Sequence, residues 1–184
     1  MPMMPPQTPA QAVDRTVREE WGRILAALVK TLGDFQLAED SLQDAVARAL
    51  EVWPNGGLPD APAAWLITTA RRKAIDRIRK DGRFAARAAE LSHLLDTAHQ
   101  DTAEHDLETI PDKRLEMIFT CCHPALSQEA QVALTLRTLC GLSARDIAQA
   151  FLVPHATMSQ RLTRAKAKIR NAAIPFRAPE GAEI

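Results

Sequence analysis

The chain has 184 residues, with 23 Lys and Arg against 23 Asp and Glu and a formal net charge of zero at pH 7. This length allows one or two small domains. The chain contains no run of 18 apolar residues, and its start, MPMMPPQTPA, lacks the charged and apolar parts of a signal peptide. We therefore expect a cytoplasmic protein with no membrane contact.

Three amphipathic helices are predicted in the first half of the chain. The first covers residues 14–33, and the second begins near Leu37 and stops at the breakers Pro54-Asn55-Gly56-Gly57. After a loop to about Pro62, the third covers 63–80. In each segment apolar residues recur at spacings of three and four, and alternating strand patterns are absent. All three tryptophans lie here, so we expect a helical domain over 13–87, preceded by a disordered N-terminus over 1–12.

The charges are arranged in blocks, although they cancel over the whole chain. Residues 71–87 contain eight Lys or Arg and two acids, whereas residues 88–112 contain seven acids and no Lys or Arg. Clusters of Lys and Arg bind polyanions, because neutralised phosphates release their counterions. The acidic stretch has few large apolar residues, so we expect a flexible acidic linker over 88–110.

A second helical domain is predicted over 111–178, followed by a tail over 179–184. It begins with helices at about 112–121 and 128–140, the latter started by Ser127. Ser143, with Asp146 three residues later, predicts a capped short helix. Pro154 is expected at the first position of another helix. Two short helices joined by a tight turn indicate a helix-turn-helix.

The last helix predicts a DNA-reading surface. One buried face is formed by Met158, Leu162, Ala165 and Ile169. The opposite face carries groups that read base edges, and its sides carry cations that bind phosphates. The first set is Ser159, Gln160, Thr163 and Arg164, and the second is Arg161, Lys166, Lys168 and Arg170. The alternative is an ordinary amphipathic helix with a solvated basic face.

The run Cys121-Cys122-His123 suggests metal binding or catalysis, but its spacing is unfavourable. Neighbouring cysteines on a helix point about 100° apart, and no CxxC pair accompanies them. We expect small buried thiols in a reducing compartment. Catalytic patterns such as Ser-His-Asp, paired carboxylates or a phosphate loop are absent. We therefore predict no enzymatic activity, no catalytic residue, no metal and no cofactor.

Three motifs in order resemble the bacterial sigma factors of the extracytoplasmic-function (ECF) type, over roughly residues 14–176. These motifs are Ala38-Glu39-Asp40-Ser41-Leu42-Gln43-Asp44-Ala45, the helix from Ala64-Trp65-Leu66 to Arg79, and the helix-turn-helix. The resemblance implies an all-α fold of two small helical domains, sigma region 2 and sigma region 4, joined by the acidic linker. It also implies a function: binding core RNA polymerase, recognising and melting a promoter, and initiating transcription.

The resemblance assigns roles residue by residue. Asp40, Gln43 and Asp44 would bind the clamp helices of the beta-prime subunit, and region 4 would contact the beta flap. The minus-ten element, melted to single strands, would be bound by Asn55, Arg71, Arg72, Lys73, Arg77, Arg79 and Lys80. The minus-thirty-five duplex would be bound by Ser159, Gln160, Arg161, Thr163, Arg164, Lys166 and Lys168. The acidic linker would either imitate the charge of RNA in the polymerase channel or simply remain solvated.

Within the family, IFTCCHPALS and AFLVPHATMSQRLTRAKAKIR resemble a subgroup that usually continues into a tetratricopeptide-like extension. This chain ends at Ile184, so we expect either that the extension has been removed or that this member lacks it, and an anti-sigma factor or that extension would be a further partner. Many relatives have Asn at the position of Arg72 and Gly at that of Leu152, where a leucine either avoids positive φ or accepts strain. The alternative function is a helix-turn-helix regulator that acts without core polymerase.

Overall fold

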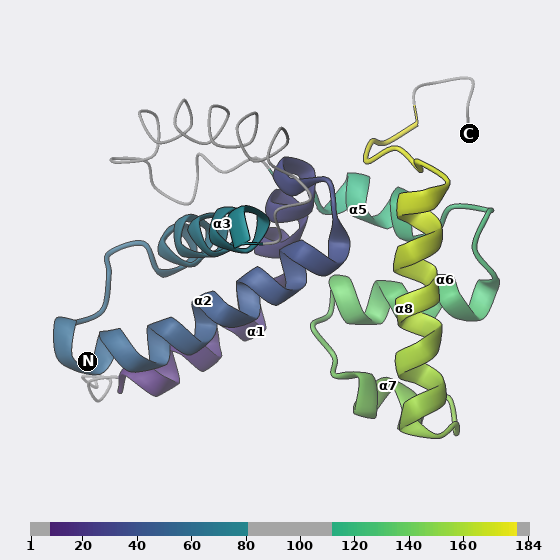
Figure 1. Ribbon diagram of the computed structural model, residues 1–184. Coiled ribbons are helices and arrows are strands. Elements are labelled where there is room, and N and C mark those ends of the chain that lie inside the picture. The colour runs from purple at the N-terminus through teal and green to yellow at the C-terminus, as the bar shows by residue number, and fades with distance from the viewer. Residues whose placement is uncertain (1–7, 81–111, 180–184) are drawn as a thin grey trace. The chain divides into compact units, whose positions relative to one another are not determined.

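The computed structural model describes residues 8–80 and 112–179, and within these ranges it contains helices and no strand. The helices of the first half are α1 (Pro9–Leu32), α2 (Phe35–Gly56) and α3 (Pro62–Lys80). Those of the second half are α5 (Arg114–Cys121), α6 (Gln128–Thr138), α7 (Ala144–Ala150) and α8 (His155–Asn171) (Figure 1). The predicted all-α class is confirmed for this part of the chain. The predicted linker over 88–110 lies outside the described residues.

Helix α1 begins earlier than the sequence analysis predicted. We expected disorder over 1–12 and a helix from residue 14, but the helix starts at Pro9. The Thr8 hydroxyl accepts a hydrogen bond from the Gln11 amide (3.3 Å), and the Gln11 side-chain oxygen accepts one from the Thr8 amide (2.9 Å). This reciprocal cap, with a proline in the first turn, starts a helix efficiently. Four-residue spacing then buries Ala12 and Thr16.

Two helix ends also differ from the prediction. Helix α2 continues through Pro54 and Asn55 to Gly56. Pro54 cannot donate a backbone hydrogen bond to the preceding turn, and the helix ends two residues after it. Helix α6 ends at Thr138 rather than near residue 140. Gly141 follows with a φ of 69°, and such a left-handed residue ends a helical path.

The first compact unit consists of α1 up to Glu20, α2 from Leu37, and α3. One face of α2 is buried through small and medium residues at helical spacing, namely Ala38, Leu42, Ala45 and Ala49. Trp53 packs edge-on against Trp65 of α3, with ring centroids 5.4 Å apart. Helix α3 buries Ala63, Leu66, Ile67, Ala70, Ala74 and Ile78. These residues of α2 and α3 therefore form a core.

The second compact unit contains α5 to α8 and also the segment Trp21–Gln36. The reason lies largely in Trp21. Its indole Nε1 donates a hydrogen bond to the Arg137 carbonyl (3.3 Å), and the Arg137 guanidinium lies 5.7 Å from the ring centroid. Gly141 brings its backbone close to the same ring, where an added Cβ would lie 3.1 Å from the indole. Trp21 thus does not belong to the Trp53–Trp65 core.

Helices α5 to α8 form a small core of their own. Helix α8 contacts both α6 and α7, and α5 contacts α6 (Figure 1). The fully buried side chains at their centre are Met117, Leu134, Ile147 and Met158. Ser127 caps α6 as predicted, because its hydroxyl accepts a hydrogen bond from the Ala130 amide. This core fixes the orientation of α8 within the unit.

Candidate nucleic-acid interface

The basic residues of α3 lie on different sides of the helix. At about 100° per residue, Arg72 and Arg79 lie opposite the buried stripe of Ala70 and Ala74. Both arginines are exposed, as is Lys80, whereas Lys73 is half-buried on a flank. This face presents positive charge away from the core.

Arg71 lies at the edge of the same surface and is half-buried. Burial lowers the pKa of its guanidinium from the usual value. An arginine nevertheless stays protonated at neutral pH. Arg71 therefore adds fixed positive charge beneath the exposed face of α3.

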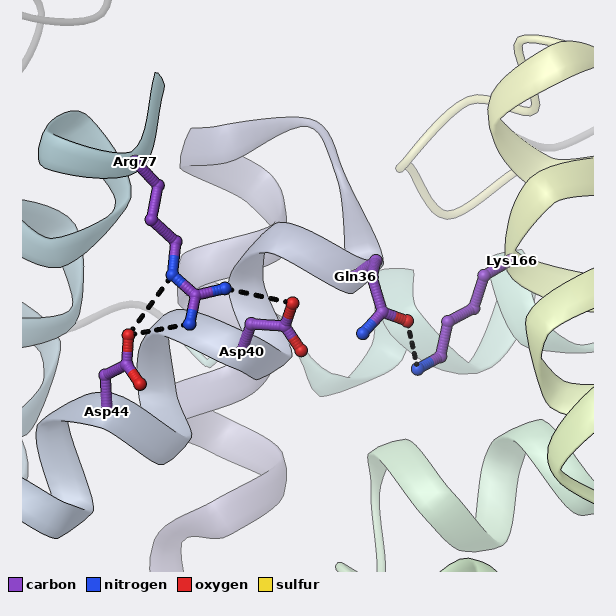
Figure 2. A network of polar contacts seen from close by, with 5 residues as sticks. All are labelled: Gln36, Asp40, Asp44, Arg77 and Lys166. Carbon is purple, nitrogen blue, oxygen red and sulfur yellow. Dashed lines mark hydrogen bonds and ion pairs between the residues drawn. The ribbon is translucent and has the colours of Figure 1, made fainter. Parts of the chain in front are cut away.

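Arg77 is placed differently from the other cations of α3. Figure 2 shows its guanidinium between two carboxylates of α2. Its Nη2 and Nε lie 2.8 and 3.2 Å from Asp44 Oδ2, and its Nη1 lies 3.1 Å from Asp40 Oδ2. The sequence contained a signal for this, because Arg77 is three and seven residues after Ala74 and Ala70, in the row that faces the bundle. The predicted docking acids and a predicted DNA contact thus form one cluster.

The other two residues proposed for the first unit are accessible. Gln43 is exposed on α2 between the two acids in sequence. Asn55 is exposed too, but it lies in the last turn of α2 rather than in the predicted loop.

The helix-turn-helix forms with the predicted caps and an unpredicted turn geometry. Ser143 and Asp146 make a complete capping box at the start of α7, and these hydrogen bonds lower the pKa of the Asp146 carboxyl. Pro154 lies at the N-cap of α8 (φ −59°, ψ 145°) rather than at its first helical position. Between the helices, Leu152 has a φ of 53° and its side chain is 93% exposed. Leucine thus occupies a left-handed position that favours glycine.

The buried face of α8 is confirmed, since Met158, Leu162, Ala165 and Ile169 are all buried. On the opposite side Gln160, Thr163 and Arg164 are exposed, and Ser159 is half-buried. The Thr163 hydroxyl donates a hydrogen bond to the Ser159 carbonyl (2.9 Å). A hydroxyl held in this way still has lone pairs that can accept a hydrogen bond from a base edge.

The flanking cations of α8 differ in their surroundings. The Arg161 guanidinium lies 5.8 Å from the centroid of the Phe151 ring, which orients it toward the turn. On the other flank, Lys166 Nζ donates to Gln36 Oε1 (3.1 Å; Figure 2), and Arg170 Nη1 lies 3.4 Å from Asp34 Oδ2. Both partners belong to the Trp21–Gln36 segment of the same compact unit.

A hollow of about 400 Å³ beside α8 was not anticipated from the sequence. It lies where α8 passes the start of α6, and Leu126, Ser127 and Ala130 form part of its wall. Three cations line the opposite side: Arg161, Arg164 and Lys168. Their spacings of three and four residues place them on one flank of α8. Their convergence on one hollow required the tertiary contact between α6 and α8.

Two family models match the chain in this order: sigma-70 region 2 at residues 17–84, and sigma-70 region 4 at residues 116–169. The chain is 30% identical to the RNA polymerase sigma-H factor of Pseudomonas aeruginosa, over 90% of this chain and 88% of that protein. It belongs to the ECF-type sigma factors. The ECF RNA polymerase sigma factor SigK of Mycobacterium ulcerans is 26% identical, over 81% of this chain and 79% of the relative.

One relative is longer than this sigma factor. An uncharacterized protein of Rhizobium meliloti is 42% identical over 86% of this chain, and the matched part is 38% of that protein's length. The region 2 match includes most of α1 together with α2 and α3, and the region 4 match includes α6, α7 and most of α8. A regulator that acts without polymerase would not need a sigma region 2, so the comparisons favour the sigma-factor interpretation over that alternative.

The cysteine cluster lies at the C-terminal end of α5, where Cys121 is the last helical residue and Cys122 the C-cap. Burial raises the pKa of the Cys121 thiol to about 12, and its Sγ lies 3.4 Å from Thr138 Oγ1. The thiol is therefore protonated near neutral pH and is a poor nucleophile. Cys122 is exposed, contrary to the expectation of buried thiols. Within the described residues, no three His, Cys, Asp or Glu side chains are grouped to hold a metal, and no helix is long and apolar enough to cross a membrane.

Proposed function

We propose that this sigma factor binds core RNA polymerase and directs it to promoters, where it helps to melt the DNA and start transcription. The observation that carries the proposal is the ordered match to regions 2 and 4, combined with an acidic cluster on α2 and cationic faces on α3 and α8. The protein works by binding, without a chemical step of its own, and acts in the cytoplasm.

Polymerase docking is assigned to Asp40, Gln43 and Asp44 of α2. They occupy one accessible stretch of the helix, and the acids would meet basic side chains on the beta-prime clamp helices. Region 4 would bind the beta flap. An anti-sigma protein or a C-terminal extension would regulate the factor by covering these surfaces.

Promoter DNA is assigned to the two cationic faces. Arg71, Arg72, Lys73, Arg79 and Lys80 would hold the backbone of the melted minus-ten strand, with Asn55 beside an extruded base. On α8, Ser159, Gln160, Thr163 and Arg164 would read base edges of the minus-thirty-five duplex. Arg161, Lys166 and Lys168 would bind phosphates. The hollow beside α8 supports the assignment of Arg161 and Lys168, because cations along one wall suit a phosphate backbone.

The test is the charge reversal Asp44→Lys in a core-polymerase binding assay. Asp44 is 40% exposed in its ion pair with Arg77. Losing such an exposed pair costs about 0.2–1 kcal/mol of folding stability. Domains have about 5–15 kcal/mol, so the variant should fold. Loss of an interfacial charge pair costs about 2 kcal/mol or more, so we expect affinity for core to fall by about 30-fold or more.

The matched control is Asp14→Lys on α1. Asp14 also lies in an exposed ion pair, with Arg18 at 2.6 Å, and its reversal changes the net charge by the same amount. The control should bind core like the unaltered protein. Equal affinities for the Asp44→Lys variant and this control would contradict the assignment of the docking surface.

A further inference from the structure

Arg77 connects two surfaces that the proposed function keeps separate. It lies on α3 among the cations assigned to DNA, yet its three hydrogen bonds all go to Asp40 and Asp44 of α2 (Figure 2). All three residues belong to the first compact unit. The question is whether Arg77 serves DNA binding, folding or docking.

The geometry argues against a DNA contact. Arg77 lies in the bundle-facing row of α3, three residues after Ala74, whereas Arg72 and Arg79 lie on the opposite side. Three of the five guanidinium N–H groups of Arg77 already bind Asp40 and Asp44, so only two are left for a phosphate. The phosphate would also approach two carboxylates of its own sign, which raises the energy of the complex.

Folding stability does not explain the arrangement either. The side chains of Arg77, Asp40 and Asp44 are 43%, 34% and 40% exposed. Water and salt screen such pairs, so they contribute little to folding. An ion pair of this kind still restricts side-chain rotamers, because the planar guanidinium fork fixes the direction of the oxygens it binds.

The arrangement suits an acidic docking surface. Asp40 and Asp44 are four residues apart on α2 and repel each other, and the guanidinium between them offsets that repulsion. Arg77 contacts only Oδ2 of each carboxylate in these bonds. A carboxylate accepts about four hydrogen bonds, so Asp44 retains capacity for a donor from a partner.

We propose that Arg77 is a positioning residue of the polymerase-docking surface, which holds Asp40 and Asp44 in the orientation that core polymerase binds, and is not a contact to minus-ten DNA. This inference rests on the proposed function, because it presumes that the two acids dock. Arg77 thus serves polymerase binding, whereas its neighbours Arg72 and Arg79 serve DNA binding.

The experiment measures binding of the labelled full-length chain to core RNA polymerase by fluorescence anisotropy. Without Arg77, the side chains of Asp40 and Asp44 rotate freely in the unbound protein and are ordered only when core polymerase binds. This ordering costs free energy, so Arg77→Ala should weaken binding about tenfold. Arg77→Lys keeps the charge but has no planar fork, so it should lose less affinity than Arg77→Ala. Arg18→Ala, which removes an exposed, ion-paired arginine from α1 in the same compact unit, should leave core affinity unchanged.

A second readout separates positioning from a general structural defect. When both acids are replaced (Asp40→Asn with Asp44→Asn), adding Arg77→Ala should cause no further loss of core affinity, because residues that act as a unit are not additive. Holoenzyme formed at saturating sigma factor should bind a single-stranded minus-ten oligonucleotide equally well with and without Arg77→Ala. Arg72→Ala should weaken that binding.

Three results would overturn the inference. The first is unchanged or tighter core binding by Arg77→Ala, the tighter case meaning that Arg77 masks the acids. The second is a full tenfold loss in the double-Asn background. The third is a loss of oligonucleotide binding equal to that of Arg72→Ala. If the unaltered chain did not bind core polymerase, the proposed function would be wrong as well. If Asp44→Lys lost affinity for core polymerase but Arg77→Ala kept it, only the positioning role would be refuted.

Discussion

Replacing Leu152 by glycine should stabilise the helix-turn-helix. Leu152 follows the last residues of α7 with a φ of 53°. Its amide donates to the Gln149 carbonyl (3.1 Å), and the Val153 amide donates to the Ala148 carbonyl (3.0 Å). This pair of hydrogen bonds is the Schellman ending of a helix, in which the left-handed residue is usually glycine.

The magnitude follows from two opposing terms. A side chain with a Cβ in the left-handed region costs about 1–2 kcal/mol. Glycine removes that strain but gains chain entropy on unfolding, which costs about 0.5–1 kcal/mol. The leucine side chain is 93% exposed, so its removal sacrifices almost no burial. The net gain is about 0.5–1 kcal/mol, equivalent to about 2–8 °C in Tm for a domain of this size.

The assay is calorimetric unfolding of the full chain, with Leu152→Ala as the control. Alanine keeps the Cβ and the strain, so its Tm should stay close to that of the unaltered protein. Ala173 ends α8 with the same pattern, a φ of 49° and hydrogen bonds from Ala173 to Arg170 and from Ile174 to Ile169. Ala173→Gly should therefore also raise the Tm. If Leu152→Gly left the Tm unchanged, or if Leu152→Ala raised it equally, backbone strain would not be the cause.

Three further outcomes are expected. In promoter selections, Arg164→Ala should change the preferred bases, whereas Lys168→Ala should weaken all sequences alike and reduce the salt slope by about 1; identical selection profiles would show that α8 is oriented differently. Ser143→Ala should cost about 1 kcal/mol in urea unfolding. Because folding lowers the pKa of the Asp146 carboxyl, this carboxylate stabilises the fold above its ordinary pKa of 3.8, and that stabilisation is lost as the pH falls below this value. In Ser143→Ala the free energy of unfolding should therefore fall less steeply at acid pH. An unchanged pH profile would contradict this explanation. At pH 8 native Cys121 should resist alkylation while exposed Cys122 and Cys140 react, so mass spectrometry should find two labels, and a third would show that Cys121 is accessible.

Local sequence patterns determined most of the fold. The buried stripe of α8 and the capping box of α7 follow from spacings within one helix, and both were predicted correctly. The early start of α1 was also readable, because Thr8 and Gln11 form a capping pair. The prediction of disorder over 1–12 did not take this pair into account.

Contacts between distant segments could not be predicted from local sequence patterns. Nothing near Trp21 in the sequence indicates that its indole meets Arg137, more than a hundred residues away. The hollow lined by Arg161, Arg164 and Lys168 likewise depends on where α6 crosses α8. Periodicity shows which face of a helix is buried, whereas the identity of the neighbour depends on how several helices pack together.

The modest energies of the surface groups make the two proposed binding sites experimentally separable. Exposed ion pairs such as Arg77 with Asp44 contribute about 0.2–1 kcal/mol each to folding. Truncating a fully buried side chain such as Met158 costs about 2–5 kcal/mol. A double replacement on the α2 acids therefore perturbs folding less than a single change in the α8 core. When such a surface variant loses a partner, the loss reports on binding, because the helices that present the surface remain intact.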